Sequence, residues 1–246
     1  MKFFVTGVGG QLGHDVMNEL LKRGHEGVGS DIQTAYSGII DNSPVSKAPY
    51  IPLDITDADA VERVIMAVNP DAVIHCAAWT AVDLAENAEN QERVRAINAG
   101  GTQNIANVCK KLNCKMTYIS TDYVFDGKER EIPYVETDAV DPQSAYGSTK
   151  LAGENFVKDF ADRYFILRTA WLYGDGKNFA RTMLRLSETH DKITVVNDQV
   201  GSPTSASELA KAIDAVLFTE NYGLFHATCE GSCCWADFAR EVLRLA

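Results

Sequence analysis

The chain has 246 residues, of which 46% are hydrophobic and 23% charged, a composition typical of a folded globular protein. Its net charge of −11 disfavours binding to nucleic acid or to an anionic membrane surface through bulk charge. No apolar run approaches the roughly 20 residues that a membrane-spanning helix needs, and the six cysteines form no C-x-x-C pair, so we expect reduced thiols and no metal site. We expect a cytoplasmic protein, because Met1-Lys2-Phe3 leads directly into a strand and not into a signal peptide.

The first predicted element is a strand over Phe3–Val5, which a glycine-rich turn joins to a helix around Asp15. Gly7, Gly10 and Gly13 stand three residues apart in this turn. The first glycine permits a positive φ, the second leaves backbone bare for a pyrophosphate, and the third lets the helix lie close to the sheet. The helix N-terminus then faces the anion, so the turn predicts a dinucleotide site; the alternative is a flexible loop without a ligand.

An acidic residue follows at the distance typical of such a site. Asp31 stands eighteen residues after Gly13, at the end of the segment 26–30. A carboxylate there is placed to accept hydrogen bonds from the adenosine ribose. It would also repel a 2′-phosphate, and no arginine stands beside it, so the local charge favours NADH over NADPH.

Strand and helix signals alternate along the rest of the chain. Further strands are predicted over 50–53, 72–78, 115–120 and 164–168, and helices over 58–68, 89–112 and 146–160. This alternation predicts an α/β fold with a doubly wound parallel (Rossmann) sheet, in which ligands bind at the carboxyl ends of the strands. After residue 168 we predict helices over 179–190, 205–218 and 235–246 and a short strand around 193–196. We therefore expect a dinucleotide-binding domain over 1–170 and a small C-terminal substrate lobe over 171–246.

Two further motifs suggest acid–base chemistry. Tyr146 and Lys150 are four residues apart on a predicted helix, so the phenol and the ammonium project from one face. A nearby cation favours the phenolate and is expected to lower the pKa of the tyrosine, which could then exchange a proton with an alcohol or ketone while a nicotinamide supplies hydride. Thr121 ends a strand, where its hydroxyl can stabilise negative charge on a carbonyl oxygen. The alternatives are an exposed surface pair and a threonine that caps a turn.

These motifs occur in the order seen in the extended short-chain dehydrogenase/reductase family, which the chain resembles over about its first 170 residues. The shared features are the glycine turn, the strand end at 75–78, the segment 98–102, Ser120-Thr121-Asp122, and Tyr146 with Lys150. The segments 80–86, 120–127, 168–174 and 198–204 resemble one branch closely, the dTDP-4-dehydrorhamnose reductases.

The resemblance implies a role for each matching residue. Tyr146 would protonate the C4 alkoxide, Lys150 would tune Tyr146 and hold the nicotinamide ribose, Thr121 would bond the ketone oxygen, and Asn98 would support the lysine through a water. The pyrophosphate of the cofactor would be held by Gly7, Gly10, Gln11, Leu12 and Gly13. The adenosine would be bound by Asp31, Asp54 and Ile55. The backbone of Ala77 and Ala78 would lie against the cofactor. Val124, Phe125 and Trp171 would wall the sugar pocket, with core packing as the alternative for the aromatic rings.

The resemblance also implies a reaction, the reduction of the 4-keto group of a dTDP-sugar by NADPH or NADH, and a homodimer as the expected assembly. A sugar-nucleotide 4,6-dehydratase is disfavoured, because such lyases carry a glutamate where Tyr123 stands. A non-catalytic subunit like the regulatory subunit of methionine adenosyltransferase stays open, since it retains the same pair. Members of the branch usually continue beyond the segment 235–240 with a basic segment that helps hold the nucleotide sugar, so we expect the substrate lobe to lack that end here.

Overall fold

The computed structural model describes residues 1–246 and is built around a seven-stranded parallel sheet. Its strand order is β10-β6-β5-β4-β1-β2-β3, with β4 at the centre and β1 between β4 and β2. The strands are β1 (Lys2–Thr6), β2 (Glu26–Asp31), β3 (Tyr50–Pro52), β4 (Ala72–His75), β5 (Lys115–Thr121), β6 (Tyr164–Thr169) and β10 (Gly223–His226). The predicted doubly wound parallel sheet is confirmed.

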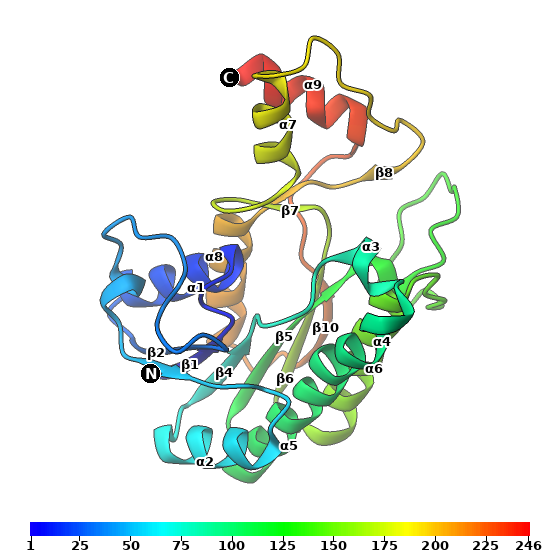
Figure 1. The fold of residues 1–246 in the computed structure, drawn as a ribbon. Helices are drawn as coiled ribbons and strands as arrows, with labels where there is room; N and C mark the ends of the chain where they lie inside the picture. The colour runs from blue at the N-terminus through cyan, green and yellow to red at the C-terminus, as the bar shows by residue number, and fades with distance from the viewer.

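Helices cover both faces of this sheet (Figure 1). On one face lie α2 (Ala58–Val68), α5 (Thr102–Leu112) and α6 (Ala145–Phe160), and on the other lie α1 (Gln11–Lys22) and α8 (Ala206–Leu217). Alternate strand residues feed the two cores: Phe4 and Val73 pack towards α2 and α5, whereas Phe3, Val5 and Ile74 pack towards α1 and α8. Both faces are therefore buried, as the nearly continuous apolar runs of the strands require.

Local signals explain where the helices begin and end. The Asp57 side chain accepts a hydrogen bond from the backbone N–H of Ala60 at the start of α2, and Asn69, in the left-handed region, ends that helix before Pro70. The Ser144 hydroxyl accepts from the N–H of Gly147 and so starts α6. Short helical segments are η1 (Pro44–Lys47), α3 (Val82–Ala85) and η3 (Asp122–Val124).

The helix predicted over 89–112 is interrupted in the structure. It consists of α4 (Ala88–Arg95), a wide π-helical stretch η2 (Ala96–Gly101) and α5. Such wide turns are frequent at functional sites. Here the stretch contains Asn98, which is hydrogen-bonded to Trp79 in the loop after β4.

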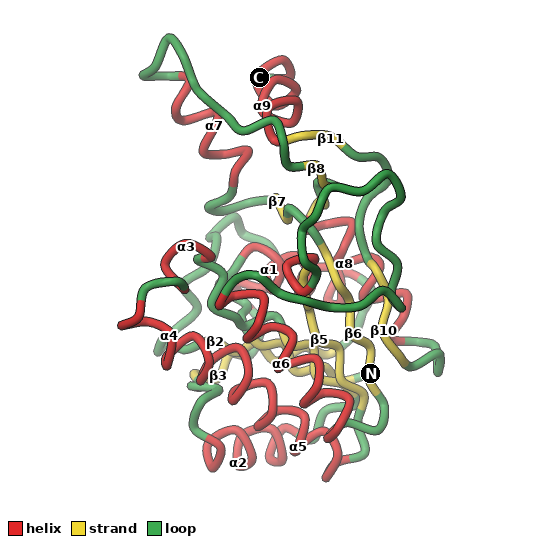
Figure 2. Tube along the Cα trace, turned by 90° about the vertical axis from the view of Figure 1, so that its right-hand side faces the viewer, coloured by secondary structure: helices red, strands yellow, loops and turns green.

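A small lobe lies beyond the carboxyl ends of the strands (Figures 1 and 2). It contains β7 (Leu172–Tyr173), α7 (Phe179–Ser187), β8 (Val200–Gly201), β9 (Thr204–Ser205), β11 (Cys233–Cys234) and α9 (Trp235–Leu245). Residues 193–196, predicted as a strand, are irregular. No helix combines the length and the apolar character needed to cross a bilayer.

The lobe is not a simple C-terminal tail, which differs from the single boundary expected at residue 170. After β9 the chain returns to the sheet domain, where α8 packs on α1 and β10 pairs with β6 at the sheet edge. Only then does it re-enter the lobe at β11. The reason is the apolar face of α8, which includes Leu209, Ile213 and Leu217 and completes the core that α1 leaves open.

Candidate active site

A cavity of about 820 Å³ opens at the carboxyl ends of the strands, between the sheet domain and the lobe. Its size suits a cofactor or substrate of moderate size. It is lined by most of the residues that the sequence singled out: Gly7, Gly10, Gln11, Leu12, Gly13, Asp31, Asp54, Ile55, Ala77, Ala78, Thr121, Tyr146, Lys150 and Trp171. The structure thus brings together both ends of the predicted reaction, the glycine turn and the tyrosine–lysine pair.

The glycine turn is tightly packed and leaves its backbone open towards the cavity. Gly7 has φ +72°, and a Cβ there would lie 2.6 Å from the backbone nitrogen of Ala77. A Cβ on Gly13 would lie 2.2 Å from the carbonyl oxygen of Gly7. Helix α1 begins at Gln11, and Gly10 at its cap offers no side chain to bond the first N–H groups. Those free donors at a helix N-terminus fit the pyrophosphate of a dinucleotide.

Two carboxylates stand at the end of the cavity where an adenosine would lie. Asp31 accepts hydrogen bonds at Oδ2 from the N–H of Gly9 (3.0 Å) and at Oδ1 from the N–H of Ile32 (2.7 Å). This holds its carboxylate against the glycine turn at the cavity's edge. Asp54 accepts from the backbone N–H and the hydroxyl of Thr56, so its own side chain shapes the turn before α2.

A buried chain of polar groups joins the strand ends beneath the glycine turn. The Thr6 hydroxyl is hydrogen-bonded to Nδ1 of His75 (2.8 Å), and Nε2 of that ring to the hydroxyl of Thr102 (3.1 Å). The backbone N–H of Ala77 also donates to Thr6. Burial, assisted by the charge of Lys150, lowers the pKa of His75 to about 3, so the ring stays neutral. The network therefore fastens β1, β4 and α5 at the floor of the cavity.

Asn98 lies behind the cavity wall and not on it. Its Oδ1 accepts from the backbone N–H of Trp79 (2.8 Å), and its Nδ2 donates to the carbonyl of Trp79 and to the hydroxyl of Thr149 (3.2 Å each). Because Thr149 precedes Lys150 on α6, Asn98 ties the loop after β4 to the helix that carries the lysine.

Three polar side chains meet where β5 and α6 reach the cavity. Thr121 ends β5, and Tyr146 and Lys150 project from the first turns of α6. A Cβ on Gly147 would lie 2.2 Å from the carbonyl oxygen of Tyr123, so α6 approaches the turn after β5 closely. The rings of Tyr146 and Tyr123 meet edge to face, with centroids 5.6 Å apart.

The electrostatics of this group differ from the sequence-based expectation. Burial raises the pKa of Tyr146 well above its usual value, and the Asp122 carboxylate raises it further, while the Thr121 side chain opposes the rise. Burial lowers the pKa of Lys150 to about 7, against the opposing effect of the Glu154 carboxylate. The lowering of the tyrosine pKa that the sequence suggested is thus not seen: burial and the Asp122 carboxylate both raise the pKa of Tyr146, and only the Thr121 side chain opposes them. Tyr146 is a proton donor in this state.

Thr121 has its hydroxyl engaged. It donates to Oδ1 of Asp122 (2.9 Å) and accepts from the N–H of Tyr123 (3.2 Å). Burial raises the pKa of Asp122. To donate to a substrate oxygen, the Thr121 hydroxyl would have to turn away from that carboxylate.

Behind Lys150, α6 carries a fully buried carboxylate. Glu154 forms a two-pronged ion pair with Arg168 of β6, with Nε–Oε1 and Nη2–Oε2 distances of 2.8 Å. The Ser120 hydroxyl donates to the same carboxylate at 2.6 Å. The burial cost of this carboxylate is offset by these bonds, which together lower the pKa of Glu154.

Two residues predicted to wall a sugar pocket lie elsewhere. Val124 and Phe125 are buried and do not line the cavity. Phe125 stacks on Tyr134 with centroids 4.2 Å apart, and the guanidinium of Arg168 lies 5.0 Å from its ring centre. The core-packing alternative therefore describes Phe125 in this structure.

Trp171 does line the cavity, in an unusual backbone conformation. Its φ is +47°, a region that tryptophan rarely adopts, and its ring stacks on Trp235 with centroids 3.6 Å apart. A Cβ on Gly201 would lie 2.5 Å from the Trp171 ring, so only glycine fits opposite it. Surroundings that hold a strained residue this firmly are typical of a binding wall.

Sequence reasoning missed several lining residues from the lobe. Lys177, Asn178 and Trp235 line the cavity opposite the glycine turn. Asn178 donates to Oε1 of Gln11 (3.3 Å), and Gln11 donates to the carbonyl of Leu172 (3.2 Å), so the Gln11 side chain points to the lobe. The sequence signal for this segment was the polar, glycine-containing run 174–178, but its partner lies more than 160 residues away in the chain.

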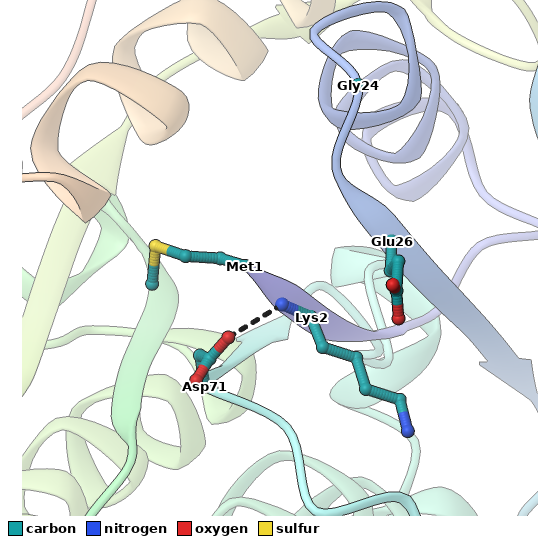
Figure 3. Close-up of a pocket in the computed structure, with 5 residues that line it drawn as sticks. All are labelled: Met1, Lys2, Gly24, Glu26 and Asp71. Carbon is teal, nitrogen blue, oxygen red and sulfur yellow. Dashed lines mark hydrogen bonds between the residues drawn. The ribbon is translucent and has the colours of Figure 1, made fainter.

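A smaller hollow lies at the amino ends of the strands, near the start of β1 and opposite the large cavity (Figure 3). Its polar groups are used to join the strand starts: the Lys2 N–H donates to Oδ2 of Asp71 (2.7 Å), and the Lys2 ammonium donates to the carbonyl of Val68 (2.6 Å). Ligands of parallel α/β sheets bind at the carboxyl ends of the strands. We therefore assign the large cavity as the candidate active site.

The fold and this cavity together define an NAD(P)H-dependent oxidoreductase of the short-chain dehydrogenase/reductase type. The model of the RmlD substrate binding domain family matches residues 1–246, and the chain belongs to that family.

Among characterised relatives, the dTDP-4-keto-6-deoxy-D-glucose reductase of Streptomyces niveus is 39% identical over 99% of this chain and 78% of its own length. Among solved structures, the dTDP-4-dehydrorhamnose reductase of Clostridium acetobutylicum is 46% identical, with a TM-score of 0.89 over 100% of this chain and 80% of its own. That of Bacillus anthracis, in complex with NADP, is 38% identical, with a TM-score of 0.88 over 99% of this chain and 80% of its own.

Proposed function

We propose that the protein reduces the 4-keto group of dTDP-4-dehydro-L-rhamnose to dTDP-L-rhamnose with NADPH or NADH. The observation that carries this proposal is that Tyr146, Lys150 and Thr121 share one cavity with a glycine turn whose backbone donors are free. The names of the relatives support the substrate, a deoxysugar attached to dTDP. We further propose that the protein acts in the cytoplasm and forms a homodimer.

The residues divide the work along the cavity. The glycine turn and the α1 N-terminus would bind the pyrophosphate, Asp31 the adenosine ribose, and the backbone of Ala77 and Ala78 would border the cofactor on the far side of Gly7. The bound cofactor supplies the hydride. Burial raises the pKa of Tyr146, so its phenol would hold the proton that is passed to the C4 oxygen of the substrate.

Thr121 and Lys150 would support that proton transfer. The Thr121 hydroxyl would donate to the C4 oxygen and stabilise its growing negative charge. The Lys150 ammonium, when protonated, would stabilise the phenolate that Tyr146 becomes after giving up its proton. Trp171, stacked on Trp235, would wall the sugar.

The proposal is tested by supplying purified protein with the keto sugar and following the oxidation of NADPH and NADH separately. We expect turnover with at least one cofactor and a dTDP-linked 6-deoxyhexose as product. Release of water from dTDP-glucose would instead identify a dehydratase. Persistent lack of turnover, together with a tight complex with another enzyme in a pull-down, would identify a regulatory subunit.

A further inference from the structure

We propose that Glu154 is a positioning residue for the reduction: its carboxylate fixes the helix that carries Lys150 to the strand that carries Thr121 and places a negative charge one helical turn from the lysine. The inference rests on the proposed reductase function, but part of its test needs no activity. Glu154 contacts neither cofactor nor substrate in this arrangement, because it is fully buried behind the cavity.

The first observation is that Lys150 is buried without an ion-pair partner. Its side chain is 3% exposed, and its ammonium lies 4.1 Å from the centre of the Tyr118 ring. The titratable groups around it are Tyr118 on β5, His75 and Cys76 at the end of β4, and Tyr146 and Glu154 on α6. His75 and the tyrosines are neutral at pH 7, and burial raises the pKa of Cys76 to about 12.

The only anion among these groups is therefore Glu154. It stands one helical turn after Lys150, where side chains four residues apart share a face. Its charge opposes the desolvation that pulls the lysine pKa down to about 7. Without it, the pKa of Lys150 would fall below its present value of about 7, and a larger fraction of the lysine would be neutral at physiological pH.

The second observation is how firmly Glu154 is held in its ionised form. Arg168 on β6 and Ser120 on β5 both donate to it, at 2.8 and 2.6 Å. Ser120 directly precedes Thr121, so one carboxylate connects the lysine's helix to the strand end that carries the catalytic hydroxyl.

The main test uses the double variant Glu154→Gln/Arg168→Met, which removes the ion pair as a unit and leaves no buried guanidinium without a partner. We expect kcat/KM for the keto sugar to stay within about twofold of wild type at pH 6, and the alkaline limb of its pH profile to move down by up to about one unit, a loss of up to about tenfold at pH 8, since the Arg168 charge is removed together with the carboxylate. The single variant Glu154→Asp keeps the negative charge and Arg168, so the alkaline limb of its pH profile should lie close to that of wild type. The matched control is Asp214→Asn, which removes another buried carboxylate paired with an arginine, on α8; it should leave the limb in place.

Urea unfolding of nucleotide-free protein tests the same coupling without catalysis. Adding Lys150→Met should raise the midpoint of the double variant more than it raises that of wild type, because burying the lysine costs more folding free energy when the carboxylate no longer opposes its desolvation. If the double variant alone does not fold, Lys150→Met should restore a cooperative transition. The proposal would be overturned if the pH profile of the double variant superimposed on that of wild type, or if Lys150→Met raised the midpoints of wild type and the double variant equally. It would also be overturned if the triple variant Glu154→Gln/Arg168→Met/Lys150→Met still did not fold. Glu154 would then have only a structural role.

Discussion

Lys150→Met is expected to make the nucleotide-free protein more stable while it abolishes turnover. In the folded protein the pKa of Lys150 falls from 10.5 to about 7 because the ammonium is desolvated. Its folded-state pKa lies below its unfolded value, so the folded protein binds fewer protons between these two pH values, and the stability of wild type rises with pH across that window. Methionine keeps a similar side-chain length and has no charge to bury.

The magnitude follows from the two pKa values. At pH 7 the unfolded lysine is fully protonated and the folded one is half protonated, which costs wild type about 4 kcal/mol of folding free energy. At pH 9 the folded lysine is neutral and the unfolded one still mostly charged, and the cost is about 2 kcal/mol. The free energy of unfolding of the variant should exceed that of wild type by about these amounts.

The assay is urea denaturation of both proteins at pH 7 and pH 9 after removal of bound nucleotide, with the slope checked for a constant exposed surface. Leu151→Met, a neighbouring change that leaves the charge in place, serves as the control and should change stability little at either pH. A destabilised Lys150→Met variant, or a gain that does not shrink between pH 7 and pH 9, would refute the reasoning that burial of this cation is a cost of the fold.

Three other changes test the site. Tyr146→Phe should lower kcat by about 10²-fold or more, the contribution of a positioned acid, with cofactor affinity within about threefold by fluorescence titration. Gly13→Ala should abolish cofactor binding in the same titration, because its Cβ would lie 2.2 Å from the carbonyl oxygen of Gly7. Asp31→Ser should raise the affinity for NADPH relative to NADH by about tenfold or more, since it removes a carboxylate and frees the N–H of Gly9 for a 2′-phosphate.

Each of these outcomes can fail on its own. Full activity of Tyr146→Phe would remove the phenol from the mechanism. Normal binding by Gly13→Ala would mean that the α1 N-terminus does not hold the pyrophosphate. An unchanged NADPH-to-NADH ratio in Asp31→Ser would place the ribose away from this carboxylate.

The parts of the site that the sequence predicts are those that short-range geometry determines. The spacing of Gly7, Gly10 and Gly13 is a property of one turn, and the pairing of Tyr146 with Lys150 is a property of one helix. Both reach the cavity because parallel strands end at a common edge. Asp31 was found in the same way, as the residue that ends the strand after α1.

What the sequence did not predict depends on contacts between distant segments. The direction of the Tyr146 pKa shift follows from how deeply α6 packs, which the four-residue spacing does not reveal. Phe125 looked equally suited to a pocket wall or the core, and only its stacking on Tyr134 decides. The single boundary at residue 170 failed to anticipate β10, since Gly223–His226 is too short to read as an edge strand without seeing its partner β6.

The route of the chain through the lobe affects how the cleft can open. Because the polypeptide leaves the sheet after β6, comes back for α8 and β10, and leaves again for α9, any swing of the lobe must bend several connections together. Gln11 adds a polar link between the glycine turn and the segment around Leu172. Such an attachment favours small, concerted adjustments of the lobe over wide hinge opening.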